Sequence, residues 1–302
     1  MTQQLPFFSV IIPTHNRESQ LASCLQALAM QEYPRDRFEV VIADDGSHQP
    51  PREILASVAG VLNVTLLIEP HGGPAAARNA GAARARGEFL AFTDDDCEPA
   101  PDWLKNVAAR LASLHTHLVG GRTINALAGN IYSATSQAMI DVGYTHFNRD
   151  PENAQFLATN NIAMPAAQFH ALGGFNSSFH FAEDREFCDR WLHHGYRMTY
   201  APEVLVHHRH HLSLRLLWRQ HFNYGRGAFL FHRIRGRRGS KFRFESAFYL
   251  AIFRYPLARD GGARGLLMEA LMAEIQMANA AGFCFQAIKG AGPSAKSSTM
   301  NE

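Results

Sequence analysis

The stretch that decides the fold is Phe89-Leu90-Ala91-Phe92-Thr93-Asp94-Asp95-Asp96, an apolar run ending in three carboxylates. A short apolar run bounded by polar residues is typical of a buried strand. Consecutive carboxylates repel one another unless a cation is present, and alternate residues of an extended chain point the same way. Asp94 and Asp96 therefore indicate a site for Mg²⁺ or Mn²⁺, hard cations that bind oxygen ligands together with substrate phosphates. The alternative is a solvated acidic turn before a helix.

Three earlier apolar runs also end in polar or turn-forming residues. They span residues 7–12, 38–43 and 61–68, and are followed by Pro13–Arg17, Asp44–Ser47 and Pro70–Gly73. Helical patterns separate them, one marked by leucines at helical spacing and one by the alanine- and arginine-rich residues 74–86. This alternation predicts an α/β fold, Rossmann-like, with a mostly parallel sheet flanked by helices. Ligands of such sheets bind at the carboxyl ends of the strands, so the polar clusters predict one composite site.

The regular alternation ends near Arg122. Residues 123–155 are mixed and polar, and predict an irregular segment or a lid. Beyond them the pattern predicts helices at 166–172 and 183–194, a strand at 197–206, and helices at 212–234, 242–258 and 265–288. We therefore expect an α/β domain over 1–211, with halves 1–120 and 121–211, which the family resemblance described below implies is the catalytic domain. A helical C-terminal extension follows over 212–302, with a mobile tail from Gly290.

Composition narrows the class of protein. Of 302 residues, 46% are hydrophobic and 19% charged, and the formal net charge is +2, which predicts a globular chain with a real core. The mean hydropathy of −0.18 excludes a polytopic membrane protein. Four separated cysteines and an N-terminus without signal-peptide character favour a reducing, cytoplasmic location.

Positive charge is concentrated late in the chain. Residues 204–264 hold thirteen Lys and Arg against Glu245 and Asp260. This balance indicates an anionic partner, such as the inner face of a membrane in peripheral contact with basic helices. The alternative is a solvated basic face on helices whose apolar sides pack on the catalytic domain. No nucleic-acid-binding module accompanies the charge, so nucleic acid is not an expected partner.

Other polar residues each allow a functional and a structural interpretation. Gly73 opens a helix that contains Arg78, and such a helix start together with an arginine can bind phosphate, or the arginine can form a surface ion pair. Glu183-Asp184 begins a helix and either stabilises its dipole or supplies a general base. His207 leads a histidine-rich tract that is either a metal or phosphate ligand or a polar exit loop.

Taken together, the sequence resembles glycosyltransferase family 2, which has the GT-A fold, over roughly residues 7–210. Each motif is short, but their order and spacing are specific. The matching segments are Ser9–Arg17, Val41–Ser47, Gly73 to Asn79, Phe92–Asp96, Gly173–Asn176, Glu183 to Arg190 and Ala201 to His207.

The resemblance implies roles for particular residues. Asp94 and Asp96 are implied to bind Mg²⁺ or Mn²⁺, with His207 as a further metal ligand, and Asp184 is implied to be the catalytic base. The nucleotide-sugar site is implied to include Pro13, Thr14, Asn16, Arg17, Asp44, Asp45, Gly73, Arg78, Asp94 and Asp95. The implied reaction is inverting transfer of a sugar from a nucleoside-diphosphate sugar, with UDP as the expected nucleotide, to a hydroxyl of a glycan or lipid-linked acceptor.

One departure from the family pattern and two alternative functions bear on this resemblance. The Gln-x-x-Arg-Trp motif of processive synthases is missing, since Trp218-Arg219-Gln220 has another order, so non-processive transfer is expected. A sugar-phosphate nucleotidyltransferase would need a glycine-rich loop after the first strand, and Thr14–Arg17 contains no glycine. A non-catalytic nucleotide-sugar-binding protein would be expected to lack some of the acidic motif residues, and all of them are present.

Overall fold

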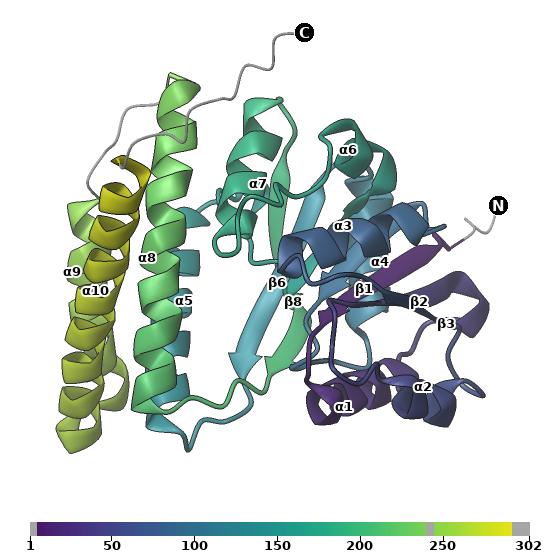
Figure 1. Ribbon diagram of the computed structural model, residues 1–302, viewed down its shortest axis with the longest axis horizontal. Coiled ribbons are helices and arrows are strands. Elements are labelled where there is room, and N and C mark those ends of the chain that lie inside the picture. The colour runs from purple at the N-terminus through teal and green to yellow at the C-terminus, as the bar shows by residue number, and fades with distance from the viewer. Residues whose placement is uncertain (1–4, 240–244, 292–302) are drawn as a thin grey trace, which may run out of the picture.

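The computed structural model describes residues 5–239 and 245–291, and consists of a central sheet, helices on both of its faces and a helical layer at one side (Figure 1). The strands are β1 Phe8–Thr14, β2 Phe38–Asp44, β3 Val64–Ile68, β4 Phe89–Thr93, β5 Cys97–Pro99, β6 Leu118–Asn125, β7 Asn161–Pro165 and β8 Met198–His208. They form one eight-stranded sheet in the order β3-β2-β1-β4-β7-β6-β8-β5.

The first four strands of that order run parallel, which confirms the α/β prediction and the parallel front half. β7 then lies antiparallel to both β4 and β6, whereas β6 and β8 are parallel and β5 runs antiparallel to β8. The carboxyl ends of β1, β2, β3 and β4 therefore meet at one edge of the sheet, where the polar clusters were expected.

The helices are α1 Glu18–Ala29, α2 Arg52–Val58, α3 Pro74–Arg84, α4 Trp103–Ser113, α5 Ile131–Phe147, α6 Ala166–Ala171, α7 Glu183–His193, α8 Leu214–Arg237, α9 Ser246–Asp260 and α10 Gly262–Ala291. Two short 3₁₀ turns lie at Arg35–Arg37 and Pro151–Asn153. The predicted helix 242–258 and the predicted mobile tail lie partly outside the described residues, which lack 240–244 and 292–302.

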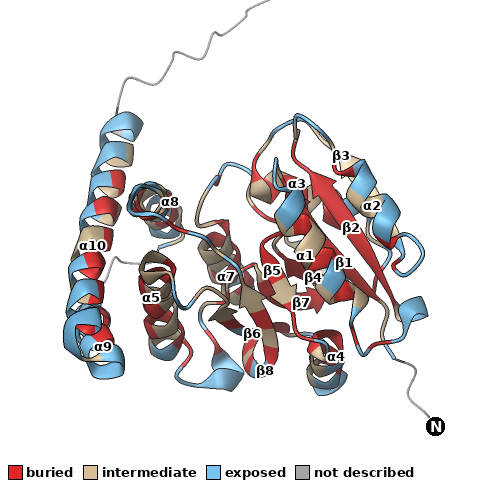
Figure 2. Ribbon diagram, turned by 90° about the horizontal axis from the view of Figure 1, so that it is seen from below, coloured by how far each residue is buried: buried red, intermediate tan, exposed pale blue. Residues whose placement is uncertain are grey.

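Side chains alternate between the two faces of the sheet along each strand, and they form one hydrophobic core on each face. Val10 and Ile12 belong to the core covered by α1, α2 and α4, whereas Ile11 belongs to the core covered by α3, α6 and α7. Neighbouring residues of a strand point to opposite faces, so an uninterrupted apolar run fills both cores. Figure 2 shows the buried strands between helices whose outer surfaces are exposed.

The expectation of an irregular segment or lid over 123–155 is wrong. β6 continues to Asn125, and the 17-residue helix α5 follows, with Asn130 at its N-cap accepting a hydrogen bond from the Ser133 amide. Threonines, serines and a glycine give this segment a weak intrinsic helix propensity. The helix is stabilised by tertiary packing, because Ala138 and Val142 are buried against residues of α8, α9 and α10.

The C-terminal helices form a layer that includes α5. Glycines allow α8 and α10 to pack closely. A Cβ atom added to Gly282 of α10 would lie only 1.8 Å from the carbonyl oxygen of Phe222 in α8, so a larger residue would not fit there. Several basic side chains of the layer make ion pairs with carboxylates, including Arg238 with Glu186 and Arg259 with Asp141. In the part of the chain that the structure describes, no helix is both long and apolar enough to cross a membrane.

Candidate functional site

The turn after β4 carries the three consecutive aspartates, and the loop after β1 supplies their first partners. Thr14 Oγ1 donates a 2.8 Å hydrogen bond to Asp95 Oδ2. The Arg17 guanidinium lies 3.1 Å from Asp95 Oδ1 and 3.0 Å from Asp96 Oδ2. Because β1 and β4 are parallel neighbours, residues about eighty positions apart converge at their ends. The side chain of Arg17 is 48% exposed, so the cation remains accessible from solvent.

Asp95 and Asp96 have different electrostatic surroundings. Burial raises the pKa of Asp95 to about 6, although Arg17 opposes the shift. Burial also acts on Asp96, but the adjacent His208 outweighs it and holds the pKa of that carboxyl well below its usual range. Asp96 is therefore the more strongly ionised of the two carboxyls.

His208, and not His207, lies at this carboxylate. His208 Nε2 is 3.2 Å from Asp96 Oδ1, and the charge of Asp96 raises the pKa of His208 against the effect of burial. The strand predicted to end at 206 continues to His208, where it pairs with Cys97, while His207 pairs with Glu98. Adjacent strand residues face opposite ways, so only one of the two histidines can point to Asp96.

The donor atoms here fit a divalent cation. Ligands bound at about 2.1 Å and at right angles lie about 3 Å apart, close to the 3.2 Å between Asp96 Oδ1 and His208 Nε2. Cys97 lies in the same cluster, but burial raises the pKa of its thiol, which keeps it protonated. Asp96 and His208 are therefore a pair of candidate metal donors that the structure brings together as an ion pair, with Asp94 at the start of the same turn.

Arg78 connects this turn to the second half of the protein. Its Nη2 lies 2.5 Å from Asp94 Oδ1, and its Nη1 lies 2.7 Å from Glu183 Oε1. The residue is 3% exposed, and the two carboxylates raise the pKa of Arg78 although burial opposes them. Arg78 thus brings the acidic turn of β4 beside the first residue of α7.

Asp184 follows Glu183 in the first turn of α7. Burial and the negative charge of Glu183 raise the pKa of Asp184 to about 7. Its Oδ1 accepts a 2.7 Å hydrogen bond from the Arg185 amide. Of the two acidic residues, Glu183 is held by Arg78, whereas Asp184 has the pKa of a group that accepts and releases protons near neutral pH.

A second polar cluster forms at the ends of β2 and β3. The Asp45 carboxylate accepts hydrogen bonds from the Gly72 amide at 2.7 Å and the Gly73 amide at 3.0 Å. Gly73 has a φ of +87°, a conformation that glycine adopts without strain, and this directs its amide to Asp45. His71 Nδ1 lies 2.9 Å from Asp45 Oδ2, and His15 Nδ1 donates to the Asp45 carbonyl oxygen at 2.8 Å.

The remaining sequence-predicted residues shape these loops. Asn16 has a φ of +54° and accepts a hydrogen bond from the His48 amide, which joins the loops after β1 and β2. Asp44 is fully buried and accepts hydrogen bonds from the Ser47 hydroxyl and amide, as in a turn. Pro13 is buried within β1 and pairs with Ala43 of β2.

The helical layer contributes a residue that the sequence reasoning missed. Tyr224 of α8 is 37% exposed, and desolvation together with the charges of Asp184, Glu183 and Asp94 raises the pKa of its phenol. Gln220 donates to the Tyr224 hydroxyl at 3.1 Å. The i to i+4 spacing of these residues places both on one helix face, but only the packing of α8 brings that face within electrostatic range of the three carboxylates. His208 and His71 were missed for the same kind of reason.

Comparison with known proteins identifies the family of this chain. The sequence matches the model of glycosyl transferase family 2 over residues 9–174. It is 30% identical over 235 residues to glycosyltransferase AglE of Haloferax volcanii, covering 75% of this chain and 74% of that protein. It is 30% identical over 212 residues to a pre-mycofactocin glycosyltransferase of Mycobacterium tuberculosis, covering 68% of this chain and 43% of that protein.

Two solved structures share the fold. Mannosyltransferase PcManGT from Pyrobaculum calidifontis, in complex with GDP-Man and Mn²⁺, aligns with a TM-score of 0.62 at 23% identity over 96% of this chain and 81% of that one. Residues 1–349 of S. aureus TarS align with a TM-score of 0.55 at 19% identity over 96% of this chain and 93% of that one. The fold and the comparisons define a glycosyltransferase of the GT-A type. The chain belongs to glycosyl transferase family 2.

Proposed function

We propose that this glycosyltransferase is metal-dependent, inverting and non-processive, and transfers a sugar from a UDP-sugar to an acceptor hydroxyl. The bridge made by Arg78 carries the proposal, because it holds the acidic turn of β4 and the Glu183-Asp184 pair side by side. A donor diphosphate near the turn would then place its sugar between the two carboxylate groups.

Asp184 is the proposed general base. It accepts the proton of the acceptor hydroxyl as that oxygen forms a bond to the anomeric carbon, and the bond from the anomeric carbon to the diphosphate oxygen breaks. One base and no protein nucleophile suffice for this displacement, so the configuration at the anomeric carbon inverts. With a pKa of about 7, Asp184 can take up the acceptor proton during transfer and release it to solvent afterwards.

Asp94, Asp96 and His208 are the proposed ligands of Mg²⁺ or Mn²⁺, with His208 in place of the expected His207. When bound, the cation acts as a Lewis acid that neutralises the departing nucleoside diphosphate. Arg17 is the proposed diphosphate contact because its cation is accessible, whereas the buried Arg78 positions Asp94 and Glu183. Asp45, Gly73 and the Thr14–Asn16 loop are the proposed contacts of the nucleotide base and ribose.

The proposed acceptor is a glycan or lipid-linked glycan that approaches from the side of α8. Exposed apolar side chains on the outer helices support peripheral contact with a membrane that carries such an acceptor; they are Leu250, Leu257, Leu266, Leu267, Phe285 and Ile288. Co-sedimentation with anionic vesicles tests this contact. A protein that stays in the supernatant at low salt would contradict it.

The central test combines binding and transfer. UDP-, GDP- and dTDP-sugars are screened by thermal shift with and without Mn²⁺, since a ligand of the folded state raises its apparent stability. We expect a Mn²⁺-dependent shift with the UDP-sugar. Asp184→Asn should keep that shift but lose transfer, whereas Asp189→Asn, the same change on the same helix, should retain transfer. NMR of the product should show an inverted anomeric centre, and retention would refute the single displacement.

A further inference from the structure

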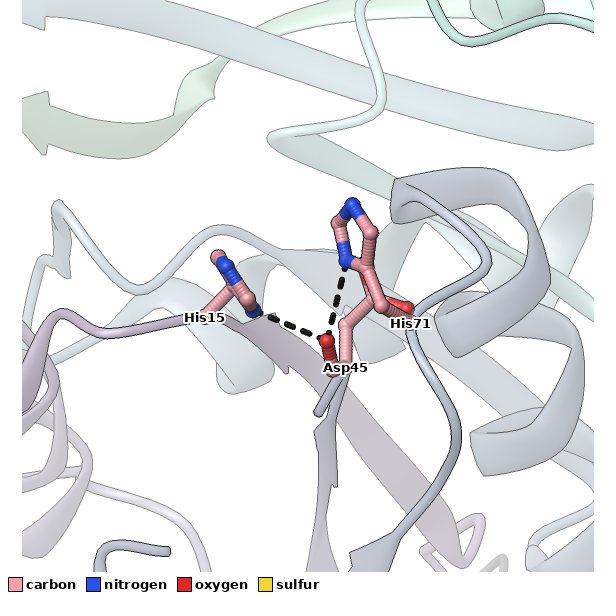
Figure 3. Close-up of side chains that lie close together, drawn as sticks. All are labelled: His15, Asp45 and His71. Carbon is pink, nitrogen blue, oxygen red and sulfur yellow. Dashed lines mark hydrogen bonds and ion pairs between the residues drawn. The ribbon is translucent and has the colours of Figure 1, made fainter. Parts of the chain in front are cut away.

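His15, Asp45 and His71 form a cluster at the nucleotide end of the site that differs in chemistry from the Asp94–Asp96 turn (Figure 3). One ligand atom from each residue lies within 4.8 Å of the others. We infer that this cluster is a second, separate metal site, specific for Zn²⁺ or a similar transition metal, and that its occupation blocks the nucleotide donor.

The topology of the sheet creates the cluster. His15 follows β1, Asp45 follows β2 and His71 follows β3, and these three strands are parallel neighbours. The loops at their carboxyl ends therefore converge on one point, as Figure 3 shows. The centroids of the two imidazole rings lie 4.6 Å apart. His15 Nδ1 donates to the main-chain carbonyl of Asp45, so Nε2, which lies 2.9 Å from Asn16 Nδ2, is the nitrogen of His15 that would bind the metal.

The donor set favours a transition metal over Mg²⁺. Two imidazoles and one carboxylate suit Zn²⁺, whereas Mg²⁺ prefers an all-oxygen environment. Three protein ligands leave a fourth, tetrahedral position for water. His71 Nδ1 already lies 2.9 Å from Asp45 Oδ2. A bound Zn²⁺ would take the place of the hydrogen that joins them, and the His71 proton would move to Nε2.

Neighbouring residues fix the orientation of the Asp45 carboxylate and leave the cluster accessible from solvent. The Gly72 and Gly73 amides orient Asp45 by hydrogen bonds, an arrangement that supports a metal-ligating carboxylate. The side chain of Asp45 is 6% exposed, but that of His71 is 66% exposed. Zn²⁺ can therefore enter from solvent at His71 and meet a carboxylate whose orientation is already set.

The blocking part of this inference rests on the proposed function. Asp45 is a proposed contact of the nucleotide base and ribose, so a metal on its carboxylate would remove an acceptor that the nucleotide uses. Zinc binding itself does not depend on that assignment. The two parts are therefore measured separately.

The first measurement is calorimetric titration of ZnCl₂ into the untagged full-length chain in excess Mg²⁺. We expect the wild type to show a tight binding event that is weakened at least about tenfold in His71→Ala and in His15→Ala, because each removes a ligand of this cluster, whatever zinc the Asp96–His208 pair also takes up. His115→Ala, which removes an exposed histidine elsewhere, and Asp96→Ala, in the β4 turn, should both retain the event. Survival of the event in His71→Ala, or its loss in Asp96→Ala, would overturn the site.

The second measurement is titration of UDP, in Mg²⁺, with and without one equivalent of Zn²⁺. We expect zinc to weaken UDP binding by at least about tenfold in the wild type but not in His71→Ala. Equal UDP affinity with and without zinc would refute the block and leave the metal site standing. Failure of UDP to bind under either condition would count against the proposed donor, and the ZnCl₂ titration would still decide the site.

Discussion

Arg78 Nη1 lies 2.7 Å from Glu183 Oε1, which joins two buried residues 105 positions apart in the chain. The other end of the same guanidinium contacts Asp94. A single arginine of α3 thus connects the turn after β4 with the start of α7. This arginine therefore holds the acidic turn of β4 beside the first turn of α7.

Removing that guanidinium should destabilise the protein strongly. In Arg78→Ala, Asp94 and Glu183 lose their shared cation in a buried site, and breaking such a pair from one side typically costs about 3–5 kcal/mol. Urea unfolding measures the loss. Arg84→Ala, an exposed change on the same helix, is the control and should unfold near the wild-type midpoint. Equal midpoints for the two variants would show that the bridge contributes little.

The rate of sugar transfer should depend on pH through the protonation state of Asp184. A general base must be deprotonated, and the pKa of Asp184 is raised to about 7. We therefore expect kcat/KM for the acceptor to rise about tenfold per pH unit below 7 and to level off above it. Asp189→Asn should show the same profile. A rate independent of pH between about 5.5 and 8.5 would argue against Asp184 as the base.

Measuring Mn²⁺ affinity distinguishes the roles of His207 and His208, the two adjacent histidines of β8. His208→Ala should weaken Mn²⁺ binding at least about tenfold, because His208 Nε2 lies at Asp96. His207→Ala is the matched control and should bind Mn²⁺ as the wild type does. Electron paramagnetic resonance of free Mn²⁺ measures both. The reverse result would identify His207 as the ligand, as the family resemblance implies.

Tyr224 should affect transfer without affecting stability. Its phenol is desolvated and feels the charges of Asp184 and Glu183, and the residue as a whole is 37% exposed. We expect Tyr224→Phe to lower kcat/KM for the acceptor about tenfold and to leave UDP affinity unchanged. Tyr255→Phe removes a hydroxyl from the same helical layer, where it contacts Asp141, and should leave transfer intact. Equal rates in the two variants would place Tyr224 outside the acceptor site.

Glu39 offers a stability prediction far from the chemistry. Its side chain is 3% exposed and accepts hydrogen bonds from Ser9 and from the main chain and side chain of Arg86. Burial acts to raise its pKa, but these bonds outweigh burial and lower the pKa below 4.5. Its stabilisation is therefore fully present above pH 4.5 and is lost as the pH falls through the lowered value.

Glu39→Gln should accordingly cost roughly 1–3 kcal/mol at pH 7 and much less in acid. Urea unfolding at pH 7 and at about pH 3 measures the difference. Arg86→Ala is the companion variant, because it removes the side-chain bonds and keeps the main-chain donor, and should cost less. A loss of the same size at both pH values would contradict the lowered pKa.

Much of the site could be predicted because strand ends are marked locally. The apolar runs that end at Thr14, Asp44, Ile68 and Thr93 carry their polar residues in the next few positions. Parallel neighbouring strands bring those positions to the same edge of the sheet. Predicting a parallel α/β sheet was therefore sufficient to predict that Arg17, Asp45, Gly73 and Asp96 lie at one edge.

Two features could not be predicted because they depend on how distant segments pack. α5 is a helix mainly through its contacts with α8–α10, and its own residues are weak helix formers. The choice between His207 and His208 depends on where β8 ends and which face it presents. A shift of one residue reverses every side chain of a strand, and local sequence does not determine that shift.

The sequence by itself determined the α/β class, the family and the carboxylates, because these follow from residue type and spacing along short segments. Only the tertiary structure decided which side chains share a partner. The Arg78–Glu183 bridge, the Asp96–His208 pair and the His15–Asp45–His71 cluster each join separate strands or helices. The physical reason is that hydrogen bonds and ion pairs depend on separations of about 3 Å, which are set by packing across the sheet and not by position in the chain.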